Sequence, residues 1–407
     1  MKRGYLSEYF DGVAAKVLSA VEADTLTSNQ HEFNGVEPLR QILGEPAGSV
    51  RYEASFIYLT DHDDEPIIDT GFLTWYDARE KARRERNVMR WEYRLYFPTN
   101  RVSQYANAGD ILVIAVRPDN TLLAIVAESG TTIAQQILWL FGISNISHPG
   151  FSVREELDTE QDRIEFASRF ILESIGIIVE SSEDTYLDEM LRQFPGGFPT
   201  TRLFSTYARS TLRGLDPLED PDAILMAWME REEILFRTFE KHLIAERLST
   251  GFADDVDGFL SFSLSVQNRR KSRAGFALEN HLEIVFNSFD IRYSRGPVTE
   301  NKAKPDFIFP GQSEYHDPQF PASRLTMLGA KSSLKDRWRQ VLSEADRIPD
   351  KHLLTLEAAI SEAQTGEMIS KRLSLVVPSQ LHETFTINQQ GWLANVREFI
   401  QFVFAKQ

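Results

Sequence analysis

The sequence predicts a two-domain protein, with a mostly β, barrel-like N-terminal domain followed by an α/β domain. The chain has 407 residues, more than one hydrophobic core usually organises. Apolar runs of strand length dominate the first 145 residues, whereas helical periodicity alternates with short strands in the second half. Hydrophobic residues make up 42% of the chain and aromatic residues 11%, which is enough for two packed cores and excludes a disordered chain.

The strand prediction for the N-terminal domain depends on three segments. Residues 50–60 alternate partly between polar and apolar side chains, and residues 90–95 alternate strictly. Residues 110–126 form two apolar runs joined by a Pro-Asp-Asn turn. Strands of this length, separated by turn residues, are typical of a barrel-like β domain.

The domain boundary is predicted between residues 150 and 190, where an acidic, helix-prone stretch leads into a Gly- and Pro-rich break at 193–201. We therefore predict an N-terminal domain over 1–165, a linker over 166–190 and a second domain over 191–407. Within the second domain, apolar residues at helical spacing predict a helix over 222–247.

Composition excludes several classes of protein. The chain has no cysteine, which excludes disulfide scaffolds, thiol catalysis and cysteine-bound metal sites. It has no apolar run of the roughly 18 to 20 residues that a membrane span needs, and its first residues reach acid too soon for a signal peptide. We expect a cytoplasmic protein with no membrane partner, whose metal ligands, if any, are carboxylates or histidines.

The net charge of −16 would repel a polyanionic partner if the charges were spread evenly over the molecule. The charges are instead distributed unevenly along the chain. Residues 71–101 carry 8 basic and 4 acidic side chains, and residues 265–347 carry 14 basic and 10 acidic ones. Between them, residues 151–200 carry 4 basic and 12 acidic side chains. Two net-positive segments around an acidic one are typical of a DNA-binding protein, although solvated charged faces give similar counts.

The most informative motif begins at Asp306, which starts a short apolar strand, and ends at Lys331, which closes a second strand 25 positions later. This is one arrangement of the PD-(D/E)xK nuclease site. Phosphodiester hydrolysis needs carboxylates that hold Mg²⁺ and a lysine that orients water and offsets developing charge. The alternative from spacing alone is a turn aspartate and a surface lysine.

The usual motif has an acid two residues before the lysine, where this chain has Gly329. The second carboxylate must therefore come from elsewhere. A helix predicted over 335–348 places Glu344 about 40° from Ile348, at the edge of its apolar side. Arg337, seven residues earlier, lies on the same face. The alternative is a partly exposed helix glutamate.

Upstream, a basic cluster is predicted in a loop. The loop leads into a helix whose apolar stripe runs from Leu278 to Phe289. Glu279 lies beside this stripe and faces the same core. Basic side chains in a loop suit phosphate contacts, although they also occur as solvated patches. The cluster comprises Arg269, Arg270, Lys271 and Arg273.

Taken together, these motifs resemble the catalytic domain of the EcoRII-like type II restriction endonucleases. The resemblance covers about residues 185–407. It is carried by Ser265-Val-Gln-Asn-Arg-Arg-Lys-Ser-Arg-Ala-Gly, Lys304-Pro-Asp-Phe-Ile-Phe-Pro, Tyr315-His-Asp, the segment 335–348, His352-Leu-Leu-Thr-Leu and Leu375-Val-Val-Pro-Ser.

The resemblance implies a restriction-endonuclease-like fold and a homodimeric, Mg²⁺-dependent enzyme that cuts double-stranded DNA at a CC-(central base)-GG palindrome, with CCWGG expected. A DNA methyltransferase is implied as its genetic, not physical, partner. Asp306 and Glu344 would be metal ligands and Lys331 the catalytic lysine, with Glu279 as a further acid and Tyr315 at the active site. The base-reading triplet would be Lys335, Asp336 and Arg337, because Arg donates to guanine and Asp accepts from cytosine.

The N-terminal half resembles, more weakly, the effector DNA-binding domain of the same enzymes, which is related to plant B3 domains. The resemblance implies that this B3-like domain binds a second copy of the site and blocks the catalytic cleft when it is unbound. Ordinary outward-facing charges are the alternative for some of its basic residues. The residues expected at effector DNA are Arg79, Lys81, Arg83, Arg84, Arg86, Arg90, Trp91 and Arg94.

Two other functions remain open from the residues. A repair or nicking nuclease of the same fold needs the same Asp306, Lys331 and Glu344. A non-cleaving DNA-binding regulator with a decayed nuclease is the other alternative, and the intact acidic and basic set argues against it.

Overall fold

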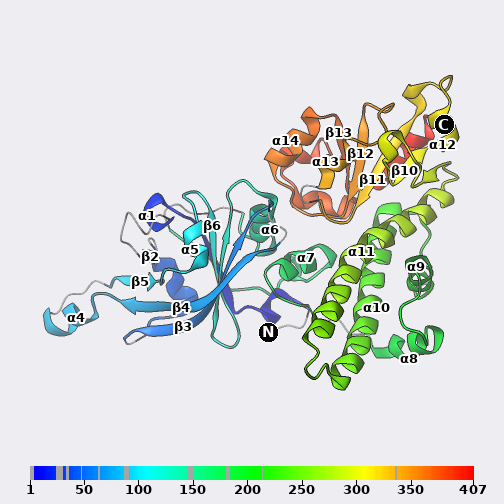
Figure 1. Ribbon diagram of the computed structural model, residues 1–407. Helices are drawn as coiled ribbons and strands as arrows, with labels where there is room; N and C mark the ends of the chain where they lie inside the picture. The colour runs from blue at the N-terminus through cyan, green and yellow to red at the C-terminus, as the bar shows by residue number, and fades with distance from the viewer. Residues whose placement is uncertain are drawn as a thin grey trace. The chain divides into compact units, whose positions relative to one another are not determined.

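The computed structural model describes residues 4–23, 31–33, 36–46, 48–62, 65–86, 91–144, 146, 150–179, 184–212, 214–334 and 337–407 (Figure 1). The chain separates into two compact units. Unit 1 comprises Met1–Ile178 with Ala359–Gln364, and unit 2 comprises Val179–Ala358 with Thr365–Gln407.

Unit 1 is built, in its described residues, on an eight-stranded sheet of order β2-β5-β4-β3-β7-β6-β1-β8. Every neighbouring pair is antiparallel except β3 and β7, which are parallel. The strands are β1 (Gly12–Val17), β2 (Glu32–Phe33), β3 (Val50–Leu59), β4 (Ile67–Asp77), β5 (Tyr93–Tyr96), β6 (Ile111–Val116), β7 (Leu122–Ala127) and β8 (Ser152–Arg154).

The β6–β7 hairpin confirms the prediction of two apolar runs joined by a turn. Val116 pairs with Leu122 at its end. Asn120 has a φ of 62°, a left-handed conformation that asparagine adopts more readily than most residues. Both strands are almost wholly buried, as expected for continuous apolar runs in the middle of a sheet.

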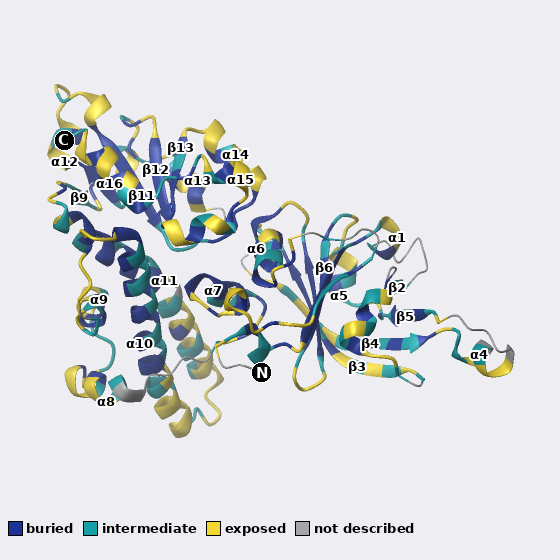
Figure 2. Ribbon diagram, turned by 180° about the vertical axis from the view of Figure 1, so that it is seen from behind, coloured by how far each residue is buried: buried dark blue, intermediate teal, exposed yellow. Residues whose placement is uncertain are grey.

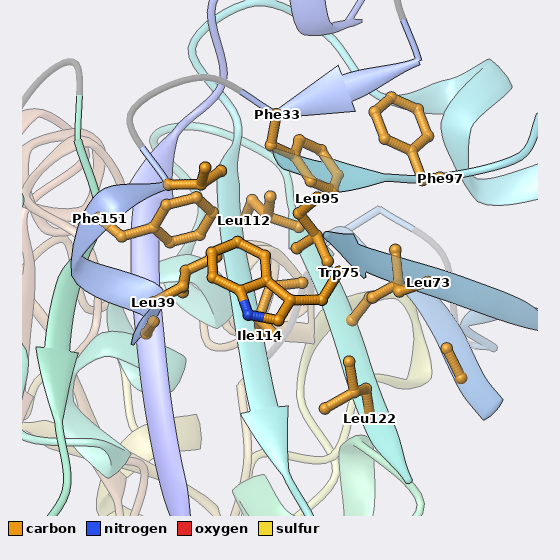
Figure 3. Close-up of a cluster of buried hydrophobic side chains, with 14 of the residues drawn as sticks. Phe33, Leu39, Leu73, Trp75, Leu95, Phe97, Leu112, Ile114, Leu122 and Phe151 are labelled. Carbon is orange, nitrogen blue, oxygen red and sulfur yellow. The ribbon is translucent and has the colours of Figure 1, made fainter. Parts of the chain in front are cut away.

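One face of the sheet encloses the core of unit 1 (Figure 3). Trp75 of β4 lies in this core and donates a hydrogen bond from Nε1 to the Gly44 carbonyl at 3.0 Å. Phe33, from the edge strand β2, and Phe151, next to the opposite edge strand β8, both belong to this core. The sheet therefore curves around one core that both of its edges border.

Short helices complete unit 1. In the region predicted as a linker, α7 buries Phe166 and Ile171, and the segment that follows reaches the first helix of unit 2. The helices are α1 (Ala20–Ala23), α3 (Arg40–Leu43), α4 (Glu80–Arg86), α5 (Arg101–Tyr105), α6 (Thr132–Leu140) and α7 (Phe166–Ser174), with 3₁₀ turns at Leu6–Glu8, Glu37–Leu39 and Glu160–Asp162.

Unit 2 contains a five-stranded mixed sheet of order β13-β12-β11-β10-β9 in its described residues. β9, β10 and β11 are antiparallel neighbours, whereas β11, β12 and β13 are parallel. The short strands predicted at Asp306 and before Lys331 are confirmed as β10 and β11. The strands are β9 (Ser294–Arg295), β10 (Phe307–Phe309), β11 (Thr326–Lys331), β12 (Lys351–Thr355) and β13 (Leu373–Val376).

Two long helices, α10 (Pro221–Thr250) and α11 (Val256–Ser288), pack side by side in unit 2 (Figure 1). Asp220 caps α10 by accepting from the amide nitrogens of Asp222 and Ala223, and Pro221 occupies the first turn. The sheet strands are buried, whereas the hairpin end of the two helices is exposed (Figure 2). The other helices are α8 (Asp184–Gln193), α9 (Thr201–Ser210), α12 (Gln312–His316), α13 (Trp338–Val341), α14 (Glu362–Ser370), α15 (Ile387–Gln390) and α16 (Val396–Phe404).

Two local predictions are wrong. The basic cluster over 269–273 lies inside α11 and not in a loop, because ion pairs of Arg270 and Arg273 with acids of α10 attach this part of the helix to its neighbour. The helix predicted over 335–348 ends at Val341, because the next amides bond carbonyls three residues back instead of four, and Ala345 then takes a left-handed conformation with φ of 52°. In the described part of the chain, no helix is both long and apolar enough to cross a membrane.

Candidate active site

Asp306 and Lys331 meet where β10 begins and β11 ends. The antiparallel register pairs Phe307 with Leu328, so the residue before β10 comes alongside the end of β11. Lys331 Nζ donates to Asp306 Oδ2 at 2.8 Å, and the Ala330 amide donates to the same oxygen at 2.7 Å. Two residues 25 positions apart in the sequence therefore form one ion pair, largely shielded from solvent.

Gly329 explains why the usual acid is missing from this strand. A Cβ at this position would lie 3.0 Å from Val341 Cγ2 and 3.2 Å from Leu353 Cδ1. Contacts this short leave no room for a carboxylate side chain. Because α13 packs directly over Gly329, a second carboxylate can reach Asp306 only from another segment.

Glu344 supplies that carboxylate from the turn after α13, not from a helix face. Its Oε2 atom is buried and has no hydrogen-bond partner among the described residues. Burial, and then repulsion by Asp306, raises the pKa of Glu344 to about 7, although Lys331 and Lys351 oppose the shift. A buried carboxylate oxygen that lacks a donor can accept a cation at low cost.

Glu279 approaches the same aspartate from α11. It forms a salt bridge with Arg295 of β9, with Arg295 Nη2 2.9 Å from Glu279 Oε2. Burial and the negative charge of Asp306 raise the pKa of Glu279, and Arg295 partly offsets this. The negative charge of Asp306 therefore raises the pKa of two carboxylates, Glu279 of α11 and Glu344 of the turn after α13.

The fit of these residues to Mg²⁺ can be judged from the donor atoms. In the described residues, no three His, Cys, Asp or Glu side chains form a ready-made metal cage. Mg²⁺ is usually held by one or two carboxylates, with waters and substrate phosphates completing its shell. Asp306 and the unpaired Glu344 Oε2 match this requirement.

Tyr315, which was expected at the active site, is buried with 1% of its surface exposed. Its hydroxyl donates to Glu300 Oε2 at 2.5 Å and accepts from the Arg347 amide at 3.3 Å. Burial and Glu300 raise its pKa. Tyr315 therefore contacts the turn that carries Glu344, and its role at the active site stays a prediction.

Of the expected base-reading triplet, Lys335 and Asp336 lie outside the described residues. Arg337 is exposed, and its Nη2 donates to the carbonyl of Ser333 at 2.9 Å and to Ser333 Oγ at 2.8 Å. Its neighbour Arg339 instead pairs with Glu367 at 2.8 Å. A guanidinium on the surface beside the site is available to a base edge.

The basic residues of α11 differ in what they contact. Arg273 is buried in ion pairs with Glu232 and Glu233 of α10, and Arg270 Nε donates to Glu240 Oε2 at 2.6 Å. Acids of α10 therefore pair with both side chains, and their contacts with phosphate stay a prediction. Arg269 stacks its guanidinium 5.1 Å from the Phe198 ring centre, and the side chain of Lys271 lies outside the description.

In unit 1, four of the eight residues expected at effector DNA pair with acids. Arg83 pairs with Asp77 and stacks 3.4 Å from the Trp91 ring centre, and the contacts of both residues with DNA stay a prediction. Exposed side chains remain at Lys81 and Arg84, of which Arg84 bonds Glu80 at 2.6 Å.

The other expected effector residues follow the same pattern. Arg79 pairs with Glu92. Arg94 pairs with Glu32 and with Glu92, and both of these distances are 2.8 Å. Arg90 and the side chain of Arg86 lie outside the description.

Sequence reasoning missed three residues that support this site. Lys351, Arg295 and Glu300 contact the Glu344 turn, Glu279 and Tyr315 respectively. A lysine at the head of an apolar strand, Lys351-His-Leu-Leu-Thr, was the available signal, because a buried lysine must have partners. For the other two, the sequence carries no signal that separates them from surface charges.

Comparisons with known proteins place these residues in a family. Residues 236–400 match the family described as EcoRII C terminal. The chain is 42% identical over 182 residues to the type II restriction enzyme EcoRII of Escherichia coli, a match that spans 44% of this chain and 45% of that enzyme. The matched region is thus less than half the length of this relative.

Solved structures give weaker likenesses. Metal-depleted Ecl18kI in complex with uncleaved DNA has a TM-score of 0.46 at 17% identity, covering 55% of this chain and 84% of that one. The restriction endonuclease PspGI in complex with substrate DNA has a TM-score of 0.43 at 18% identity, covering 51% and 93%. From the sequence match, residues 236–400 carry an EcoRII C-terminal domain, and through it the chain is related to a type II restriction enzyme.

Proposed function

We propose that this protein is a type II restriction endonuclease that hydrolyses both strands of a short DNA palindrome in the presence of Mg²⁺. The observation that carries the proposal is the meeting of Asp306, Lys331 and the unpaired Glu344 carboxylate beside one strand end. The match of residues 236–400, which include all three, to the family described as EcoRII C terminal supports it, as does the 42% identity to EcoRII over 182 residues.

In the proposed site, Asp306 and Glu344 hold Mg²⁺, which when bound would polarise the scissile phosphate and favour ionisation of a nearby water. Lys331 holds its ammonium 2.8 Å from Asp306, where it can orient the attacking water and stabilise charge that develops on the phosphate. Glu279, fixed by Arg295, is the further acid. In the reaction, water adds to phosphorus and the bond from phosphorus to the leaving ribose oxygen breaks.

We propose that the recognised sequence is CC-(central base)-GG, with CCWGG expected. Arg337 is exposed beside the site and can donate two hydrogen bonds to guanine O6 and N7. Lys335 and Asp336 complete the proposed triplet. A homodimer would supply one catalytic site for each strand of the palindrome, since two-fold symmetry of the protein matches that of the DNA.

Residues 1–165 are proposed to form a B3-like effector domain, with 191–407 as the catalytic domain. The eight-stranded sheet of unit 1, with a hydrophobic core that residues at both sheet edges join, supports the barrel-like part of this proposal. Binding of a second site by this domain would relieve autoinhibition of cleavage. A cognate DNA methyltransferase is the expected genetic partner, since a restriction enzyme requires protection of the host sequence.

The test is incubation of purified full-length protein with Mg²⁺ and plasmids that carry zero, one or several CC-N-GG sites, followed by sequencing of the ends. Discrete double-strand cuts at one palindrome, faster on plasmids with several sites, are expected. Site-specific binding without cleavage would favour the DNA-binding regulator. Nicking of one strand by a monomer would favour the repair nuclease.

A further inference from the structure

We propose that Lys351 is a positioning residue that holds Glu344 at the active site by closing the turn that carries it. The inference rests on the proposed function, because it concerns where the second metal-binding carboxylate is held. It adds a residue that acts on Glu344 through the backbone, without touching metal or DNA.

The turn after α13 needs further contacts to fix its conformation. α13 contains four residues, Trp338–Val341, and beyond it the Glu344 amide bonds the Val341 carbonyl, three residues back, at 3.2 Å. Ala345 has a φ of 52°, a left-handed conformation that is unfavourable for a residue with a Cβ. A short helix followed by a strained residue does not by itself fix the direction of the Glu344 side chain.

Lys351 supplies these contacts with its ammonium group. Nζ donates to the carbonyl oxygen of Glu344, to that of Ala345 at 3.1 Å and to that of Ile348 at 3.0 Å. A lysine ammonium has three donors, and all three are used on this one turn. The side chain is buried, with 7% of the residue exposed, and burial of an unpaired ammonium would be costly.

The backbone of Lys351 is part of the catalytic sheet. Lys351 is the first residue of β12, which pairs in parallel with β11, the strand that ends at Lys331. On its other side it pairs with Leu373 of β13. The Glu344 turn is therefore fixed to the same sheet that positions Asp306 and Lys331.

Other contacts attach neighbouring parts of the turn. Glu300 accepts from the Asp346 amide at 3.2 Å, and the Tyr315 hydroxyl accepts from the Arg347 amide at 3.3 Å. These contacts keep residues 346 and 347 in place, whereas Lys351 bonds the peptide of Glu344 itself. Loss of Lys351 should therefore loosen Glu344 while the turn stays attached.

The test is a double-mutant cycle in the full-length protein with Lys351→Met, Glu344→Gln and the pair. The primary measurement is Mn²⁺ binding without DNA, followed by electron paramagnetic resonance, with cleavage at varied Mg²⁺ as the second. Lys371→Met, at an exposed lysine in the same unit, is the matched control. Lys351→Met should weaken Mn²⁺ binding about tenfold or more, and in the Glu344→Gln background it should have almost no further effect.

Equal Mn²⁺ affinity of Lys351→Met and wild type, or losses that add in the double variant, would overturn the inference. If Lys351→Met does not fold, Lys351→Gln keeps two amide donors for the carbonyls and should weaken Mn²⁺ binding in the same direction. Wild-type protein that binds Mn²⁺ through Glu344 but cuts no DNA would overturn the proposed function alone. Wild-type protein without saturable Mn²⁺ binding would overturn both.

Discussion

Val341 of α13 occupies the space beside Gly329 of β11, where its Cγ2 would stand 3.0 Å from any added Cβ. Gly329 is two residues before Lys331, the position at which the nuclease motif usually has an acid. Three residues after Val341, the chain brings in Glu344, whose Oε2 is buried without a partner. The helix that excludes a carboxylate from the strand is thus followed by the turn that supplies one.

Gly329→Ala should destabilise unit 2 by about 1–3 kcal/mol, because the added methyl group would overpack Val341 and Leu353. Chemical denaturation monitored by circular dichroism measures this change. The control is Gly366→Ala in α14, where a Cβ meets nothing within 4 Å and helix propensity favours alanine. Equal stability of the two variants would show that β11 and α13 can accommodate the added methyl group without cost.

Lys331→Ala should leave specific DNA binding nearly unchanged while it reduces cleavage by about 10²–10³-fold or more, because the ammonium stabilises charge that develops during reaction. Binding is measured by gel shift without divalent cation, and cleavage by single-turnover kinetics. A loss of binding as large as the loss of cleavage would contradict this role.

Arg337→Ala should cost about 1–3 kcal/mol of discrimination at one guanine of the site, because two hydrogen bonds to its major-groove edge are lost. The measurement compares binding to the cognate site with binding to a site substituted at that guanine. Arg339→Ala is the matched control, since Arg339 pairs with Glu367 and should leave discrimination unchanged.

His352 should make stability depend on pH in the acidic range. Burial, and then the positive charge of Lys406, lowers the pKa of His352 to about 4 from its ordinary 6.5, and the ring packs 5.3 Å from that of Phe399. Because the folded-state pKa is depressed, this stability is present above pH 6.5 and is lost as pH falls toward 4. The loss should reach at most about 3 kcal/mol.

The measurement for His352 is urea denaturation of wild type and His352→Leu at several pH values between 4 and 8. The variant should lose part of the slope in this range, whereas the control His316→Gln, at an exposed histidine, should keep the wild-type slope. If the free energy of unfolding changes with pH in the same way in all three proteins, groups other than His352 cause the pH dependence.

The sequence by itself determined the elements whose signals are local. Apolar runs and a Pro-Asp-Asn turn gave the β6–β7 hairpin, and the segments at Asp306 and before Lys331 are strands as predicted. The sequence also predicted that Asp306 and Lys331 meet, because their spacing is one arrangement of the PD-(D/E)xK nuclease motif.

Only the tertiary structure decided how the remaining charges are used. The apolar pattern of the sequence predicted a helix through Glu344, but α13 ends at Val341. Glu344 lies instead in a turn that includes the left-handed residue Ala345 and is bonded by Lys351. Arg273 and Arg83 were predicted to contact DNA from their charge alone, and only the folded chain shows that Glu233 and Asp77 pair with them. The physical reason is that charge and period are properties of one segment, whereas burial and ion pairing depend on which segments pack together.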